Sequence, residues 1–490
     1  MAIDSSNGDK FCGGGNIVMK ERLKKLFPAS IQYPLKYIYG AIPPRFRYGK
    51  VFWDTYNFLK ISQWWSRERL EEYQMQQISK LLNHAYENVP YYRKVFDERE
   101  LKPGDIQNFD ELKKLPYLTK EIIQKNLPDL VARNYAKSKL QYVTTGGSTG
   151  IPLGFYHEKG VSAAKEQAFM FTQWNRVGFK IGDRCVTLRG NVVRSASKGK
   201  FWEYDPINKN LILSSYHMTD ETLPKYIAKI REFRLAFIQA YPSAITILAR
   251  FMRKNNVKPF FSIKAILCGS ENLYPWQREL LEEVFQCRVY SWYGHSEQAI
   301  LAGECEKSTC YHIFPEYGFV ELIDKEAELL TKDKEYKLGE IVATGLNNYV
   351  CPFIRYQTMD LAVPTSIKWC ECGRNYPLIK TVEGRLQELV VTEDGRVITL
   401  TALIFAQHFE AFSKVKEMQL VQEKEGEITV KVVKSSQYSA NDEKEILSKM
   451  QRAVGSGLDV NFEYVDHIPR TKTGKFRFLI QKLPIKFGDD

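Results

Sequence analysis

Hydrophobic and polar residues follow two different periods along the chain. In residues 66–97 the apolar positions recur at helical spacing, and the pattern predicts a helix that ends before Pro90, because the residue before a proline disfavours helical backbone. A second helix is predicted after Asp110. From about residue 140 to residue 360, short apolar runs such as "CVTLRG" and "IKAILCGS" alternate with helical patterns such as "YPWQRELLEEVF". This alternation is typical of α/β layers.

The C-terminal part has a pattern of its own. "VKEMQLVQEKEGEITVKVV" predicts two strands joined by a turn at Gly426, and "LDVNFEYV" predicts a further strand. The segment between them predicts a helix with Ser439 and Asp442 as its capping box. We therefore expect an α/β protein with a large N-terminal domain of layered sheets and helices, residues 17–384. A small α+β domain, residues 385–490, is expected to follow it, and residues 1–16 are expected to be a mobile tail.

The composition adds expectations about partners and compartment. The chain has 490 residues, and its 70 Lys and Arg exceed its 58 Asp and Glu by 70 − 58 = 12, which suits anionic partners such as nucleotides, nucleic acid or acidic lipid. Nine cysteines in so long a chain predict a metal site or buried thiols rather than a disulfide scaffold. The first sixteen residues contain no hydrophobic signal core, so a cytoplasmic protein is expected.

Basic and apolar residues interleave in the N-terminal arm, residues 19–48. Such a pattern suits peripheral contact with a membrane surface. Prolines at positions 28, 34, 43 and 44 argue against a long amphipathic helix, so a packed arm is the favoured interpretation.

The stretch "QYVTTGGSTGIPLGFYHE" contains seven consecutive small residues. A linker is one interpretation, but the flanks on both sides have strand composition, and backbone amides of small residues can surround a phosphate. The Walker lysine is missing, and a strand rather than a helix is predicted to follow. The candidate phosphate-binding residues are Thr144, Thr145, Gly146, Gly147, Ser148, Thr149 and Gly150.

The pattern "TTGGSTGIP" resembles the phosphate loop of adenylate-forming enzymes, the superfamily of acyl-CoA synthetases, luciferases and peptide-synthetase adenylation domains. Further stretches resemble that superfamily's other motifs, in its order: "ILCGSENL", "YSWYGHSEQ", "RYQTMDLA", and "EGRLQELV" followed by "PRTKTGKFR". Several segments, among them "LLNHAYENVPYYRKVF" and "CEKSTCYHIFPEYGFVEL", resemble the phenylacetate–CoA ligase branch. They are most similar to its members connected with capsular-polysaccharide biosynthesis. The branch also includes synthetases that adenylate a deazaflavin coenzyme.

The resemblance implies nucleotide-binding roles for particular residues. Tyr293 would stack on adenine, Glu297 would hold Mg²⁺, and Asp360 would bind the ribose hydroxyls. Met359 stands where the family has glycine, so the local turn is expected to differ, and Gln387 and Glu388 occupy the hinge, where aspartate is commoner. The remaining implied nucleotide residues are Gly269, Ser270 and Glu271 beside the adenine, Gly294, Ser296 on a phosphate, and Arg385 after the ribose motif.

A catalytic lysine and a two-step reaction are also implied by the resemblance. Lys475 would be the catalytic lysine of the small domain, which in this superfamily rotates about the hinge between the two steps. A carboxylate would attack the α-phosphate of ATP to form an acyl-adenylate, and the acyl group would then pass to CoA, a sugar amine or a carrier. The acyl group is expected near Arg189, Tyr241, Trp292 and His295, which follow or end predicted strands beside the motifs.

Four cysteines and a histidine form two tight clusters in the region of about residues 303–373. Tetrahedral zinc prefers thiolate and imidazole ligands, so a structural zinc ion is predicted, with five candidates for four places. The usual pattern of the branch favours Cys305, His312, Cys370 and Cys372, and leaves Cys310 as a spare or a substitute.

Two alternatives stay open at this point. One is adenylyl transfer to a coenzyme or another hydroxyl acceptor, with AMP kept on the product. The other is a basic scaffold that binds nucleic acid or a membrane surface through a degenerate nucleotide site. Against the scaffold, Glu297, Asp360 and Lys475 are all present, and no specific nucleic-acid partner is expected.

Overall fold

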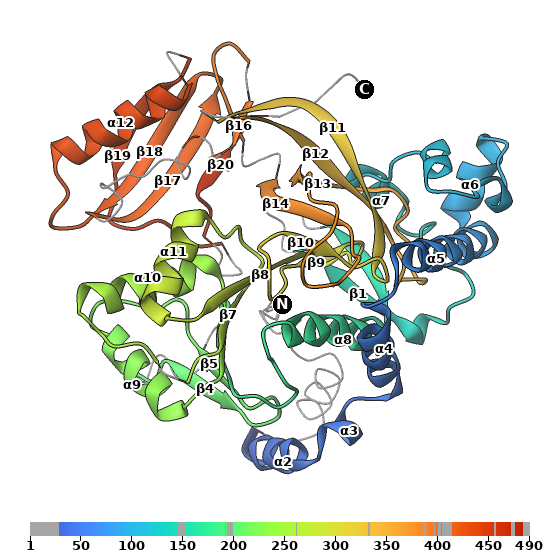
Figure 1. Ribbon diagram of the computed structural model, residues 1–490, viewed down its shortest axis with the longest axis horizontal. Coiled ribbons are helices and arrows are strands. Elements are labelled where there is room, and N and C mark those ends of the chain that lie inside the picture. Colours follow the sequence, from blue (N-terminus) through green and yellow to red (C-terminus); the bar gives the residue numbers. More distant parts are fainter. Residues whose placement is uncertain are drawn as a thin grey trace.

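The computed structural model is built around one twelve-stranded sheet (Figure 1). It describes residues 29–145, 153–191, 193, 199–260, 262–331, 334–385, 389–395, 397–399, 403, 414–454, 457–471 and 476–483. The sheet order is β11-β12-β13-β14-β10-β9-β8-β7-β6-β3-β5-β4. Its strands are β3 (Cys185–Leu188), β4 (Trp202–Asp205), β5 (Asn210–Leu213), β6 (Phe237–Ala240), β7 (Ala265–Cys268), β8 (Arg288–Gly294), β9 (Leu301–Gly303), β10 (Tyr311–Ile313), β11 (Gly318–Thr331), β12 (Lys334–Gly345), β13 (Tyr356–Pro364) and β14 (Leu378–Arg385).

One half of this sheet is parallel and buried on both faces. Strands β3, β5, β6, β7 and β8 run parallel, and alternate side chains point to opposite faces. On β7, Ala265 and Leu267 pack in the cluster of α8 (Ser162–Asn175), whereas Ile266 and Cys268 pack in the cluster of the helices on the other face. Those helices are α9 (Leu223–Phe233), α10 (Pro242–Lys254) and α11 (Pro275–Phe285). The carboxyl ends of parallel strands meet at one sheet edge, where ligands commonly bind.

The other half is antiparallel, and it is flanked by the helices of the N-terminal region (Figure 1). These helices are α4 (Lys50–Ser62), α5 (Arg67–Asn88) and α6 (Pro90–Glu98), and the predicted helix end before Pro90 is confirmed. The prediction of a helix directly after Asp110 is wrong about where the helix begins. Residues Asp110–Lys114 form only a short 3₁₀ segment, because Pro116 disfavours helical backbone at Leu115. The α-helix α7 (Lys120–Asn126) begins later, where the Thr119 hydroxyl accepts a hydrogen bond from the Ile122 amide.

The N-terminal arm packs on the turn between β4 and β5. It forms α2 (Ala29–Ala41) and α3 (Pro44–Arg47), and the Arg47 guanidinium donates to the Ile207 carbonyl. Gly40 lies against this turn so closely that a Cβ there would be 2.4 Å from the Pro206 carbonyl oxygen. Ile38 and Phe46 are nevertheless exposed, so the expected peripheral membrane contact stays a prediction. Among the described residues, no helix is both long enough and apolar enough to cross a bilayer.

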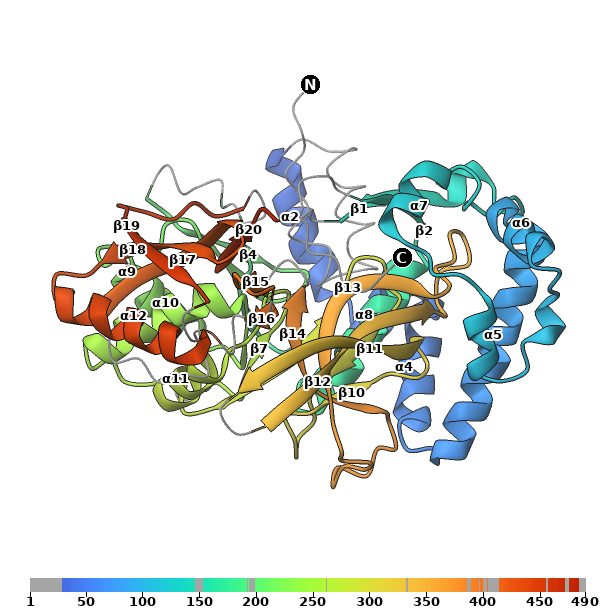
Figure 2. The same ribbon diagram turned by 90° about the horizontal axis from the view of Figure 1, so that it is seen from above.

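The C-terminal domain contains a four-stranded sheet, and the small pair of β15 (Leu389–Val391) and β16 (Val397–Thr399) precedes it. Three strands of the larger sheet and the helix are those that the sequence pattern predicts, whereas β20 was not predicted. The sheet order is β19-β18-β17-β20, with β17 (Val415–Lys424), β18 (Glu427–Lys434), β19 (Asp459–Tyr464) and β20 (Leu479–Gln481). Helix α12 (Ala440–Val454) covers it, and the Ser439 amide and hydroxyl both donate to Asp442. The domain lies beside α10 and α11, on the opposite side of the molecule from α5 and α6 (Figures 1 and 2).

Candidate active site and metal centre

Three residues expected near the acyl group meet at the carboxyl ends of the parallel strands. Arg189 follows β3, is only 5% exposed, and donates from Nη2 to the Ser270 hydroxyl at 2.7 Å. Its guanidinium carbon lies 5.6 Å from the ring centroid of Tyr241 and 5.6 Å from that of Trp292. Gly269 allows this packing, because a Cβ there would be 2.4 Å from the indole of Trp292. The predicted adenine turn and the predicted acyl residues are thus in direct contact.

A second group of predicted site residues joins the end of β8 and the segment after it to β13. The Tyr293 hydroxyl donates to Asp360 Oδ2 at 2.5 Å, and the Tyr356 hydroxyl donates to Glu297 Oε1 at 2.9 Å. Both carboxylates are buried, with 6% exposure for Asp360 and 8% for Glu297. Tyr356 was not among the residues expected from the sequence, although it belongs to the quoted stretch "RYQTMDLA".

Met359 lies inside β13, where the pairing with β12 shifts register. Its φ of +63° is in the left-handed region, which favours glycine. The expectation that the local turn differs from that of the family stays a prediction. Asp360 pairs with Arg385 of β14 in the antiparallel register, so the backbone of Arg385 lies opposite the ribose motif.

His295 is the fourth residue expected near the acyl group. Its side chain is 9% exposed, and its Nδ1 lies 3.3 Å from Glu297 Oε2 without hydrogen-bond geometry. Neither ring nitrogen has a hydrogen-bond partner among the residues that the structure describes. On the α8 side, the buried Glu166 carboxyl accepts a hydrogen bond from Tyr317. Burial raises the pKa of Glu166 to about 7, and the nearby His295 counteracts part of that rise. Glu166 was missed from the sequence, although an acid two positions before the apolar run "AFMF" is a usable signal.

The base of the small-residue loop lies beside this group. Thr144 ends β1 (Leu140–Thr144). The Thr145 amide donates to the Leu153 carbonyl at 2.9 Å, and the Leu153 amide donates to the Thr145 hydroxyl at 3.1 Å. Strand β2 (Gly154–Glu158) then returns, and the hairpin packs in one cluster with Ala299, Ile300 and Tyr356. The other five loop candidates, Gly146, Gly147, Ser148, Thr149 and Gly150, lie outside the described residues. Gly294 is the last residue of β8, and Ser296 is half-buried two positions later.

The C-terminal domain contacts the adenine turn through Glu271. Glu271 Oε1 accepts from the Phe476 amide at 3.0 Å and from the Ser243 hydroxyl at 3.1 Å, and Oε2 accepts from the Ser243 amide at 3.0 Å. The rings of Tyr274 and Phe478 also meet edge to face at 5.3 Å. Lys475 lies outside the described residues, as do Gln387 and Glu388, but the residue after that lysine is bonded to the predicted nucleotide turn.

Cys305, His312, Cys370 and Cys372 form a compact set of metal-ligand atoms, all within 4.8 Å of one another. The sulfurs of Cys305 and Cys370 are 3.6 Å apart, and Cys372 Sγ is 3.3 Å from His312 Nε2. His312 Nδ1 lies 3.1 Å from the Cys310 carbonyl, which can only accept, so Nε2 is left for a metal. A hydrogen bond from Cys305 lowers the pKa of the Cys372 thiol to about 2. The same hydrogen bond with Cys372 raises the pKa of the Cys305 thiol. Three thiols and one imidazole fit tetrahedral zinc.

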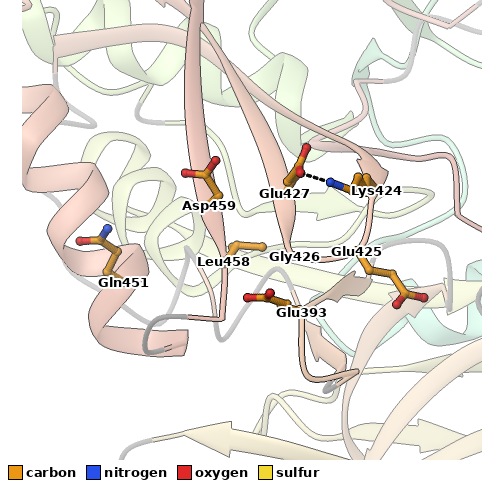
Figure 3. A pocket seen from close by; sticks show the side chains of 8 residues that line it. All are labelled: Glu393, Lys424, Glu425, Gly426, Glu427, Gln451, Leu458 and Asp459. Carbon is orange, nitrogen blue, oxygen red and sulfur yellow. Dashed lines mark hydrogen bonds and ion pairs between the residues drawn. The ribbon is translucent and has the colours of Figure 1, made fainter.

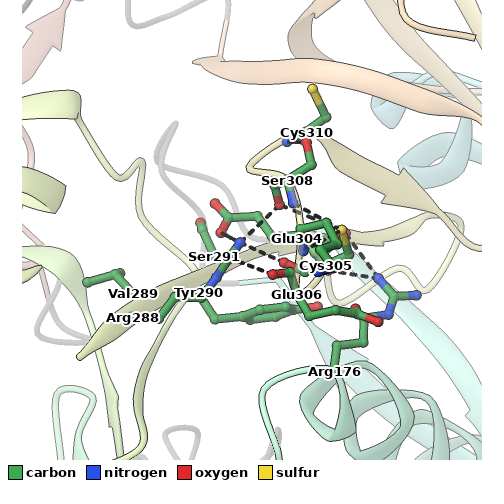
Figure 4. A network of polar contacts seen from close by, with 12 residues as sticks. Arg176, Arg288, Val289, Tyr290, Ser291, Glu304, Cys305, Glu306, Ser308 and Cys310 are labelled. Carbon is green, nitrogen blue, oxygen red and sulfur yellow. Dashed lines mark hydrogen bonds and ion pairs between the residues drawn. The ribbon is translucent and has the colours of Figure 1, made fainter. Parts of the chain in front are cut away.

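Cys310 is not part of this set. Its sulfur points away from Cys305 (Figure 4), and its carbonyl instead positions His312. Arginines hold the loop that carries Cys305. Arg288 donates to the carbonyls of Cys305 at 2.6 Å and Ser308 at 3.0 Å, and Arg374 donates to Glu306 at 2.8 Å. The loop geometry is therefore built in part by protein contacts.

A cavity of about 710 Å³ lies in the C-terminal domain (Figure 3). It is lined by Glu393, Lys424, Glu425, Gly426, Glu427, Gln451, Leu458 and Asp459. None of these residues is among the site residues predicted from the sequence, and a cluster of acidic side chains is not by itself a site.

The sequence of the chain is similar to those of CapK and of phenylacetate–CoA ligases. Residues 390–482 match a family described as the CapK C-terminal domain. The chain is 26% identical to Protein CapK of Staphylococcus aureus, across 92% of this chain and 100% of CapK. It is 25% identical to a phenylacetate-coenzyme A ligase of Thermus thermophilus, across 84% of this chain and 96% of that one.

Among solved structures, 2-hydroxyisobutyryl-CoA ligase in the postadenylation state with R3-HIB-AMP has the same fold. The TM-score is 0.65 at 17% identity, across 86% of this chain and 91% of that one. The resemblance to adenylate-forming enzymes and to the phenylacetate–CoA ligase branch is confirmed, and so is the predicted fold class. The phenylacetate-coenzyme A ligases it resembles are acid–thiol ligases by name.

Proposed function

We propose that this chain, a homologue of CapK and of phenylacetate–CoA ligases, is an acid–thiol ligase that uses ATP to activate a carboxylic acid as an acyl-adenylate. The observation that carries the proposal is the pair of hydrogen bonds from Tyr293 to Asp360 and from Tyr356 to Glu297. They join motifs more than fifty residues apart at the sheet edge where ligands of α/β proteins bind.

The first step makes a poor acyl donor reactive. A carboxylate oxygen attacks the α-phosphorus of ATP, the new O–P bond forms, and the bond to pyrophosphate breaks. Catalysis of this kind depends on positioning and on charge neutralisation. Asp360 and Tyr293 would hold the ribose and the adenine, with Gly269, Ser270 and Glu271 at the adenine edge and Arg385 nearby. The loop of residues 144–150, with Ser296, would hold the phosphates.

Two further groups act at the phosphorus in this proposal. Lys475 would supply a positive charge, and the Glu297 carboxylate, which accepts a hydrogen bond from Tyr356, would bind Mg²⁺. When bound, that ion neutralises charge on the phosphate oxygens. Removal of one preorganised group of this kind typically costs about 10²–10³ in rate.

In the second step an acceptor attacks the acyl carbonyl and AMP leaves. CoA is the acceptor named for the phenylacetate–CoA ligases and for the ligases of the same fold. The likeness to CapK extends the proposal to a sugar amine or a carrier in surface-polysaccharide biosynthesis. Adenylyl transfer to a coenzyme or hydroxyl remains the alternative, and it differs because AMP stays on the product.

ATP–pyrophosphate exchange with a panel of carboxylic acids tests this function. We expect exchange that depends on one class of acid and falls at least about a hundredfold in Lys475→Ala. Lys472→Ala, in the same loop, is the matched control and should keep most activity. Release of free AMP after an acceptor is added identifies acyl transfer, whereas AMP retained on the product identifies adenylyl transfer. A protein that binds no ATP would contradict both and support the scaffold.

A further inference from the structure

We infer that the acid activated at this site carries a second anionic group, which Arg189 binds with help from His295. The inference rests on the proposed function and narrows its substrate class. It excludes simple fatty acids and simple aryl acids as the preferred substrates.

The first argument is a cation in a buried place. Arg189 is 5% exposed at the carboxyl end of β3, beside the predicted adenine turn. The rings of Tyr241 and Trp292 and the Ser270 hydroxyl fix the guanidinium in position. A fixed guanidinium has a planar fork of N–H donors that fits a carboxylate or phosphate.

The second argument is independent of the arginine. His295 has both ring nitrogens buried without a hydrogen-bond partner, and a neutral imidazole offers one donor and one acceptor. Buried polar groups in folded proteins are almost always bonded, so an unsatisfied one at a site calls for a ligand. Glu297 Oε2 lies 3.3 Å from Nδ1 but lacks the geometry of a hydrogen bond. A ligand oxygen at His295 would meet this requirement.

The two residues belong to one region. Trp292 contacts Arg189 and lies three positions before His295 on the same chain segment, at the end of β8. Glu271, the acidic residue of the adjacent turn, is already bonded to Ser243 and Phe476. A purely apolar acyl group would leave His295 unsatisfied, whereas an acid with a distant carboxylate supplies acceptor oxygens.

Matched pairs of acids test the inference in the exchange reaction: hexanoate with adipate, and phenylacetate with 4-carboxyphenylacetate. We expect the wild-type protein to prefer the diacid in each pair by about tenfold or more in kcat/KM, the scale of a charge-assisted hydrogen bond. Arg189→Met should abolish that preference by reducing diacid turnover selectively. Arg189→Lys, which keeps the charge but loses the fork, should retain part of it. His295→Phe should reduce the preference while leaving the KM for ATP unchanged.

The possible outcomes separate this inference from the function it rests on. Exchange that favours the monoacids in the wild-type protein would overturn the inference and leave the ligase function standing. An equal loss with monoacids and diacids in Arg189→Met would also overturn it, because the arginine would then act on the nucleotide or on the fold. Thermal unfolding of each variant identifies loss of fold. No exchange with any acid would remove the proposed function, and the inference with it.

Discussion

Met359 illustrates how a single residue can adopt a backbone conformation that its side chain disfavours. Its φ of +63° places a non-glycine residue in the left-handed region, and its side chain packs in the cluster shared with the C-terminal domain. We expect Met359→Gly to be more stable than Met359→Ala by about 1 kcal/mol, because both lose the packing but only glycine relieves the backbone strain. Urea unfolding measures the difference.

Met418 is the matched control for this comparison. It lies in the same cluster, in strand β17, but it does not have a left-handed φ, so alanine should be more stable than glycine at that position. If the alanine variant were also the more stable one at Met359, backbone strain at that residue would be ruled out.

The residue scale also shows what sequence reasoning can and cannot reach. Tyr293, Glu297 and Asp360 were predicted as site residues because each belongs to a motif. Tyr356 and Ser243 were not predicted as site residues. Their roles depend on β13 crossing to Glu297 and on α10 beginning beside Glu271. No local pattern encodes such long-range contacts.

At the scale of elements, the metal centre joins two loops. Cys305 lies between β9 and β10, and Cys372 lies between β13 and β14. We propose that zinc links these loops, and we expect about one zinc ion per chain in protein purified without chelator. Cys372→Ser should lose the metal and lower the Tm by several degrees, since a ligand bound only by the folded state stabilises that state.

Cys310→Ser separates this centre from an adventitious thiol site. Because the Cys310 thiol points away and only its carbonyl contacts His312, this variant should keep the zinc and its Tm (Figure 4). Metal analysis and calorimetry on both variants check the prediction. Equal zinc loss in both variants would mean that Cys310, too, holds the ion.

The elements themselves could be predicted to different degrees. Pro90 predicts where α5 ends, and the Ser439–Asp442 pattern predicts where α12 begins. Both are local signals. The prediction for the segment after Asp110 was wrong, because a short 3₁₀ turn and an α-helix begin with the same sequence pattern. The alternation of strands and helices indicated α/β layers, but the reversal at β8 and β9, where the sheet becomes antiparallel, depends on pairing that periodicity does not encode.

At the scale of the whole molecule, the relation between the two domains would determine which step of the proposed reaction can occur. The described contacts between them include Arg250, which donates to the Val415 carbonyl at 3.1 Å, and Glu271, which accepts from the Phe476 amide at 3.0 Å. The second contact lies directly after Lys475, so it would hold the lysine loop at the nucleotide turn. If adenylation requires this arrangement and acyl transfer requires another, weakening the contact should affect the two steps unequally.

Glu271→Ala tests this expectation, with Glu279→Ala as the control because Glu279 is exposed on the neighbouring helix α11. A hydrogen bond to a charged group contributes about 1.5–3 kcal/mol, so pyrophosphate exchange should fall by about tenfold or more in Glu271→Ala. Transfer from chemically prepared acyl-adenylate to the acceptor should change by less than about threefold, because that step does not need the lysine at the phosphorus. An equal fall in both steps would show that Glu271 supports the site rather than the docking of the C-terminal domain.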